Sequence, residues 1–151
     1  MPAAPPIEQW PLSRLLITAG RLVERDIARE LRPYHLSHAS LSVLSLVQGQ
    51  PLSQRALAQA TRVEEQTVSQ TVDRLERMGL VTREKDPADR RRFMITVSAA
   101  GAAVLRRAAG KDHAEQALRD LPEAEHLRSS LLTLLRRFDA EDLVAAAEPQ
   151  A

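Results

Sequence analysis

Residues 52–97 read LSQRALAQATRVEEQTVSQTVDRLERMGLVTREKDPADRRRFMITV. The first half of this stretch predicts two short helices. Ser53 is a residue type that caps helix N-termini, so the first helix is expected to start there and to end near Ala60. After a brief turn, the second helix is expected over about residues 65–78, because Gly79 is typical of a helix C-terminus. Two short helices joined by a turn indicate a helix-turn-helix.

The second half of the same stretch predicts a β-hairpin. Residues 80–85 and 93–97 are short runs that favour strands, and the Asp-Pro-Ala-Asp-Arg sequence at 86–90 is a turn-forming cluster between them. A helix-turn-helix followed by a hairpin is a winged helix-turn-helix, which we expect over about residues 36–97. The expected fold class is therefore mainly α with a small β-hairpin.

Amphipathic helices are expected on both sides of this lobe. Apolar residues recur every three to four positions over residues 12–31, and Pro33 should end that helix. Another helix should cover residues 37–49, between a Ser cap and a Gly. After the hairpin we expect one helix over about residues 98–120 and a last one over about 123–138, separated by a Leu-Pro pair.

The composition limits the class of protein. The chain has 151 residues, of which 44% are hydrophobic and 27% charged, so we expect one folded domain rather than a disordered chain. Aromatic residues make up only 3%, which favours helices packed through Leu, Val, Ile and Ala. The chain contains no cysteine, which excludes disulfides, zinc ribbons, thiol nucleophiles and cysteine redox switches.

Several other classes of protein are not expected. No apolar run is long enough to span a membrane and no signal peptide is recognisable, so we expect a cytoplasmic protein without a membrane partner. The chain shows no Gly-rich phosphate loop, no Ser-His-Asp set and no pair of buried carboxylates that the sequence locates. We therefore expect that the protein is not an enzyme, that it has no catalytic residues and that it binds no cofactor.

The second short helix has a free polar face. Val68, Val72, Leu75 and Met78 fall on one side of the helix, and polar residues fall on the other. The DNA major groove is about 12 Å wide and admits one helix, whose exposed polar side chains pair with base edges. An ordinary solvated helix face is the alternative. The DNA-contacting candidates in this motif are Gln66, Thr67, Ser69, Gln70 and Arg74, with Ser53 from the preceding helix.

The hairpin is rich in basic residues. Five Lys and Arg side chains lie between residues 83 and 92, against three carboxylates. An Arg-rich tip can enter the minor groove or bind flanking phosphates, whereas a run of charge taken alone is usually a solvated surface. The two helices that precede the hairpin favour DNA. The candidates here are Arg83, Lys85, Arg90 and Arg91.

Three runs of residues around the hairpin resemble a known family. They are Gly-Leu-Val-Thr-Arg at 79–83, Asp-Pro-Ala-Asp-Arg-Arg at 86–91 and Ile-Thr-Val-Ser-Ala-Ala-Gly at 95–101. Together they closely resemble the wing signature of the multiple-antibiotic-resistance regulator (MarR) family. The order of the expected elements is also similar to that family over about residues 10–140.

The Asp-x-Arg pattern formed by Asp89 and Arg91 is fairly specific to this family's wing. From the resemblance we expect Arg91 to contact DNA and Asp89 to orient it. A bidentate carboxylate–guanidinium pair would hold the long Arg side chain in one conformation, so Asp89 can matter without touching DNA.

The resemblance also implies a homodimeric transcriptional regulator, a repressor of a pseudo-palindromic double-stranded DNA operator. In this reading the whole chain, residues 1–151, is one domain, and the helices at about 10–33 and 98–145 interlock as the dimer interface. Independently, a small winged lobe cannot cover the apolar stripes of these helices, although a monomer with the helices folded back is the alternative. The expected dimerisation residues are Leu12, Leu15, Leu16, Leu127, Leu131, Leu134, Leu135 and Phe138.

One departure from the family pattern leaves a second function open. Glu64 and Glu65 stand where the recognition helix of the family commonly begins with a Ser or Asp cap and a neutral or basic residue. Carboxylates are unfavourable near phosphates unless they accept from a cytosine amino group. The alternative function is a winged-helix protein-interaction module, or antirepressor, without strong DNA binding.

The resemblance implies a small aromatic or phenolic anion as the effector that releases DNA. Trp10, Arg14, Tyr34 and His38 are the candidate ligand-binding residues, since Arg supplies charge and the rings supply stacking. Purely structural roles for the same side chains are the alternative. His35 and His38 lack nearby partners for a metal ion, so no metal site is expected.

Overall fold

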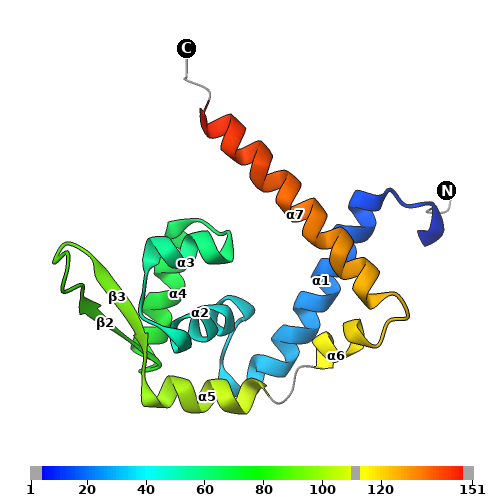
Figure 1. Ribbon diagram of the computed structural model, residues 1–151. Coiled ribbons are helices and arrows are strands. Elements are labelled where there is room, and N and C mark those ends of the chain that lie inside the picture. The colour runs from blue at the N-terminus through cyan, green and yellow to red at the C-terminus, as the bar shows by residue number, and fades with distance from the viewer. Residues whose placement is uncertain (1–4, 110–112, 148–151) are drawn as a thin grey trace. The chain divides into compact units, whose positions relative to one another are not determined.

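The computed structural model describes residues 5–109 and 113–147, and it divides into two compact units, one up to residue 112 and one from residue 113. The first unit contains, in chain order, η1 (Ile7–Gln9), α1 (Leu12–Leu31), η2 (Arg32–Tyr34), α2 (His38–Gly49), β1 (Leu52–Ser53), α3 (Gln54–Thr61), α4 (Glu65–Arg77), β2 (Val81–Lys85), β3 (Phe93–Val97) and α5 (Ala99–Ala109). The second unit contains α6 (His113–Arg119) and α7 (Ala124–Ala147). The expected fold class, mainly α with a small hairpin, is confirmed (Figure 1).

Two serines start helices, as the sequence predicts. The Ser37 hydroxyl accepts a hydrogen bond from the Ser40 amide at 3.1 Å, and the Ser53 hydroxyl accepts one from the Ala56 amide at 3.2 Å. Each bond satisfies one of the amides that the first turn of a helix leaves without a partner. These local bonds fix where α2 and α3 begin.

The end of α4 leads directly into the hairpin. Gly79 adopts a left-handed conformation with φ of 70°, which a residue without a Cβ tolerates, and the Leu80 amide donates to the Leu75 carbonyl at 2.9 Å. Ser98, at the far end of the hairpin, donates its hydroxyl to the Gly79 carbonyl at 2.6 Å. Both ends of the hairpin are therefore attached to the end of α4.

The sheet has three antiparallel strands in the order β1-β3-β2. In the hairpin, Val81 pairs with Val97 and Lys85 with Phe93. The additional strand β1, which sequence reasoning missed, pairs Leu52 with Ile95. Only two residues long, β1 is too short to show an alternating pattern of its own.

The hydrophobic core lies in the first unit, where α3 and α4 pack against each other and against α2. Its fully buried members come from α2, α3, α4, β2 and β3: Val43, Leu44, Val47, Leu57, Val68, Val72, Leu75, Val81 and Ile95. As the composition predicts, these side chains are aliphatic. The core fixes α4 and the hairpin as parts of one lobe, and Figure 1 shows the hairpin extending away from the helices of that lobe.

The helices after the hairpin differ from the expectation. The single helix predicted over 98–120 is two helices, because α5 ends at Ala109 and α6 begins at His113. Gly110 follows α5 directly, and glycine disfavours helix more than any residue except proline. The last helix runs to Ala147 rather than stopping near Phe138, since no Gly or Pro interrupts the intervening residues. Among the described residues, no helix is both long and apolar enough to cross a membrane.

Candidate nucleic-acid interface

The two faces of α4 are divided as the sequence predicts. Val68, Val72 and Leu75 are buried, whereas Gln66, Thr67 and Gln70 are exposed. Ser69 is half-buried. The apolar face packs against the core, so the polar face is exposed and accessible to a partner as large as a DNA duplex.

Arg74 lies on the same exposed side but is already engaged. Its guanidinium donates to the His35 carbonyl at 3.1 Å, across 39 residues of sequence. His35 has a positive φ of 55° in the turn between η2 and α2. Arg74 thus ties the last turn of α4 to this turn, a contact that no local sequence pattern indicates. Its expected base contact remains a prediction.

Ser53 is placed differently from the expectation. Its side chain is buried, caps α3 and lies 3.4 Å from the Arg92 guanidinium, which donates to it. The hydroxyl is therefore mostly buried and already has two partners within the protein, and its expected DNA contact remains a prediction. Ser53 was identified in the sequence as an N-cap, and in this role its side chain is held inside the protein.

An open groove of about 670 Å³ lies beside this serine, between the start of α3 and the hairpin. Sequence reasoning missed three of its residues, Arg55, Gln59 and Arg92. Arg55 and Gln59 are exposed polar residues four positions apart on α3, a spacing that places them on one helix face and could have identified them. The lining residues are Ser53, Gln54, Arg55, Ala56, Gln59, Glu65, Arg91, Arg92 and Phe93.

The tip of the hairpin is shaped by two aspartates. Asp86 accepts from the Ala88 amide at 2.9 Å, and Asp89 accepts from the Arg91 amide at 3.0 Å. Both are the local side-chain-to-backbone bonds by which Asp forms turns. The Asp89 carboxylate thus orients Arg91 through its backbone amide, and the expected pair with the Arg91 guanidinium is not formed in this structure and stays a prediction for the DNA-bound protein.

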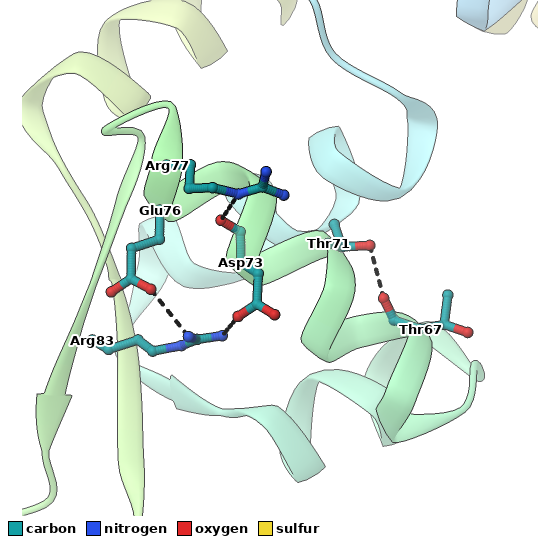
Figure 2. A network of polar contacts seen from close by, with 6 residues as sticks. All are labelled: Thr67, Thr71, Asp73, Glu76, Arg77 and Arg83. Carbon is teal, nitrogen blue, oxygen red and sulfur yellow. Dashed lines mark hydrogen bonds and ion pairs between the residues drawn. The ribbon is translucent and has the colours of Figure 1, made fainter.

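The remaining basic residues of the hairpin fall into two groups. Lys85, Arg90 and Arg91 are exposed and carry their charge to solvent around the tip. Arg83 is only 23% exposed, and its guanidinium forms ion pairs with Asp73 and Glu76 of α4, as Figure 2 shows. Arg83, which we expect to contact DNA, thus already has two partners within the protein.

The four candidate ligand-binding residues are not gathered into one site. The Arg14 guanidinium stacks over the Trp10 ring at 3.8 Å, and Trp10 donates to the Pro5 carbonyl. Tyr34 donates its hydroxyl to the Arg107 carbonyl of α5 at 3.0 Å. His38 alone among the four lines a cavity of about 210 Å³, which also includes Glu24 of α1 and Thr67 and Thr71 of α4.

The expected dimerisation residues include large apolar side chains left in contact with solvent. On α1, Leu12 is 81% exposed and Leu16 is also exposed, whereas Leu15 is half-buried. Leu131 and Leu134 of α7 are half-buried. Among the side chains of α7 that the structure describes, the exposed large apolar ones are Leu127, Leu132, Leu135 and Phe138, of which Leu132 was not anticipated.

No metal centre is formed by the part of the chain that the structure describes. There, no three His, Asp or Glu side chains gather into a group that could hold an ion. The chemistry of the candidate interface is therefore that of hydrogen-bonding amides and hydroxyls on α4 and guanidinium and ammonium groups on the hairpin.

Several known proteins are similar to this chain in sequence and architecture. The model of the MarR family matches residues 36–92. A "Putative transcriptional regulatory protein for hcr operon" from Thauera aromatica is 34% identical over 104 residues, which cover 66% of this chain and 61% of that relative. An "Uncharacterized HTH-type transcriptional regulator YcgE" from Bacillus subtilis (strain 168) is 31% identical over 132 residues, covering 87% of this chain and 75% of the relative.

A solved structure matches both the fold and the sequence. The transcriptional repressor CouR, bound to a 23-mer DNA duplex, superposes with a TM-score of 0.72 at 28% identity, over 85% of this chain and 92% of CouR. The family model matches the part of the winged lobe that precedes β3, and the likeness to YcgE and CouR extends well beyond that lobe. The chain therefore belongs to the MarR family of transcriptional regulators.

Proposed function

We propose that the chain is a homodimeric, sequence-specific DNA-binding repressor of transcription. The observation that carries this proposal is the placement of a free polar helix face and an Arg-rich hairpin tip on one lobe with one core. In this function α4 enters the major groove, and the hairpin tip reaches the adjacent minor groove or its phosphates. The DNA duplex bound to CouR supports the same class of ligand.

The proposed division of the chain follows from this function. Residues of about 36–97 form the DNA-binding lobe, and the helices at about 10–33 and 98–145 form the dimer interface. The exposed leucines of α1 and α7 support a second copy of the chain as the partner that covers them. Two linked lobes then read half-sites of a pseudo-palindrome about one helical turn apart.

The proposed base-reading role is tested by Gln70→Ala. Gln70 is exposed on α4 and has an amide that can pair with an adenine edge, so its loss should weaken binding to the cognate operator by about 1–3 kcal/mol. Binding to random DNA should barely change. Fluorescence anisotropy titrations measure both affinities, with the operator taken from genomic fragments that the protein selects.

Arg90→Ala provides the contrast on the same protein. Arg90 is exposed at the hairpin tip, and a phosphate contact there predicts weaker binding to all sequences alike, with a log affinity versus log salt slope smaller in magnitude by about 1 per monomer. An equal effect of Gln70→Ala on cognate and random DNA would show that Gln70 reads no base. Failure to bind any genomic fragment at low salt would instead favour the protein-interaction module suggested by Glu64 and Glu65.

The shape of the hairpin tip is tested by Asp89→Ala. This change removes a negative charge from the DNA-binding surface, yet we expect lower affinity, because the bond from the Arg91 amide to the carboxylate holds the tip in its turn. Asp89→Asn is the matched control, since it removes the charge but keeps the accepting oxygen. Affinities at fixed salt should fall for Ala and hold or rise for Asn, whereas tighter binding by both variants would reduce Asp89 to a repulsive charge.

We also propose that a small effector releases the protein from DNA, and this proposal is supported by one cavity. The cavity beside His38 touches α1, α2 and α4, so a ligand held there would contact the proposed base-reading helix directly. Its volume of about 210 Å³ lies below the 300–1,000 Å³ common for drug-sized ligands, which limits the effector to a small single-ring molecule. Trp10, Arg14 and Tyr34 do not line this cavity and stay untested as ligand contacts.

A further inference from the structure

Arg83 links the hairpin to α4 through two ion pairs. It is the third residue of β2, and its guanidinium lies 2.5 Å from an Asp73 carboxylate oxygen and 3.0 Å from a Glu76 carboxylate oxygen. Figure 2 shows the guanidinium lying between the two carboxylates, which project from one side of the helix, three residues apart. The planar guanidinium can donate to two acceptors at once in a fixed geometry.

These ion pairs form a second attachment between α4 and the hairpin. The first attachment is the Gly79 turn, where the backbone reverses direction through bonds at Leu75 and Ser98. Strand β3 is held separately, by its pairing with β1 and by the buried side chain of Ile95, which leaves β2 as the outer strand of the sheet. The bridge from Arg83, the third residue of β2, is a direct tie between this outer strand and the helix, and it adds to the contacts that set the direction of the hairpin relative to α4.

The same bridge changes the charge that α4 presents. The Asp73 and Glu76 side chains are 50% and 41% exposed, and both stand on the helix proposed to enter the major groove. Without a cation between them, two carboxylates would face the phosphates of bound DNA. Arg83 offsets this repulsion while being mostly covered itself, with 23% of its side chain exposed.

We propose that Arg83 is a positioning residue, which acts on DNA binding through Asp73 and Glu76 and does not itself contact a phosphate. It holds the hairpin tip at the separation from α4 at which both elements engage DNA together. This inference depends on the DNA-binding function proposed above. It reassigns a residue that its charge alone would place among the direct DNA contacts.

A double-mutant cycle on the full-length protein tests the proposal. Arg83→Gln in the otherwise unaltered chain should weaken binding to the cognate operator by about 10-fold, whereas the same change in an Asp73→Asn/Glu76→Gln background should cost less than about 2-fold. The salt slope should stay within about half a unit of its original value, because no phosphate contact is lost. Thermal unfolding of each variant confirms that the fold is kept.

Two further variants sharpen the test. Arg90→Gln is the matched control on the same hairpin, and a direct phosphate contact there predicts an equal loss in both backgrounds together with a smaller salt slope. Arg83→Lys keeps the charge but replaces the fork with a single ammonium group, so it should recover only part of the affinity. A phosphate contact, in contrast, would be largely kept by lysine.

The outcomes separate the inference from the function on which it depends. Equal losses for Arg83→Gln in both backgrounds, with a slope reduced by about 1 per monomer, would make Arg83 a direct contact and overturn the proposal. No loss in either background would also overturn it. In both cases the unaltered protein still binds its operator, whereas a protein that binds no DNA would overturn the proposed function first.

Discussion

Gly101→Ala is expected to destabilise the protein by about 3 kcal/mol, although alanine is the better helix former. Gly101 lies in the first turn of α5, and a Cβ at this position would stand 2.0 Å from the Leu80 carbonyl oxygen and 2.9 Å from a methyl group of Val97. The carbonyl is backbone and already accepts from the Ser98 amide at 3.0 Å. It cannot rotate away as a flexible side chain would, so the helix or the hairpin must shift.

Urea and thermal unfolding measure this change. A loss of about 3 kcal/mol corresponds to a melting temperature lower by roughly 6–12 °C for a chain of this size. The matched control is Gly49→Ala at the end of α2, where a Cβ would meet nothing within 4 Å and stability should change by less than about 1 kcal/mol. Equal stability of the two variants would mean that α5 and the hairpin adjust freely at this contact.

The second large effect is expected from Leu135→Asp. Leu135 is 45% exposed on α7, so a single chain can accept the substitution without burying the new carboxylate. In the proposed homodimer the same position is covered, and an unpaired buried carboxylate costs several kcal/mol. The mass measured by sedimentation should therefore fall from twice that of the chain to that of a single chain.

The loss of the dimer should also weaken operator binding by about 10²- to 10⁴-fold, because two linked lobes bind two half-sites with a high effective concentration. Ser129→Asp is the matched control, since it introduces the same charge at an exposed serine on the side of α7 opposite the stripe of Leu127, Leu134 and Phe138. The proposal that α7 dimerises through this face would be contradicted by a dimer that survives Leu135→Asp, or by one that Ser129→Asp dissociates equally.

Exposure in the structure also selects which leucine to change. Leu131 was an equally good choice from its spacing, but it is half-buried within its own unit. Both leucines line a groove between α6 and α7, but a carboxylate at the half-buried Leu131 would perturb the packing of these helices as well as the proposed interface, whereas Leu135 is 45% exposed. Leu135→Asp tests association with less disturbance of the single chain.

Most of the winged lobe could be predicted from the sequence because its signals are local. The caps at Ser37 and Ser53 and the glycine at Gly79 act on neighbours within about four residues, and the faces of α4 follow from a helical period. The same signals failed after the hairpin. A long run of good helix formers does not say whether one helix or two will form, and α5 and α6 are separate.

The roles of individual polar residues were decided by partners that are distant in sequence. Charge and position made Arg83, Arg74 and Asp89 candidates for DNA contact or for orienting it, and the sequence by itself determined that a basic hairpin follows a polar helix face. Only the tertiary structure brings Arg83 between two carboxylates of α4 and the Arg74 guanidinium to the His35 carbonyl, 39 residues away. Periodicity and capping arise from bonds along one segment, whereas an ion pair or a close contact such as that of Gly101 with Leu80 exists only once separate segments have packed around a common core.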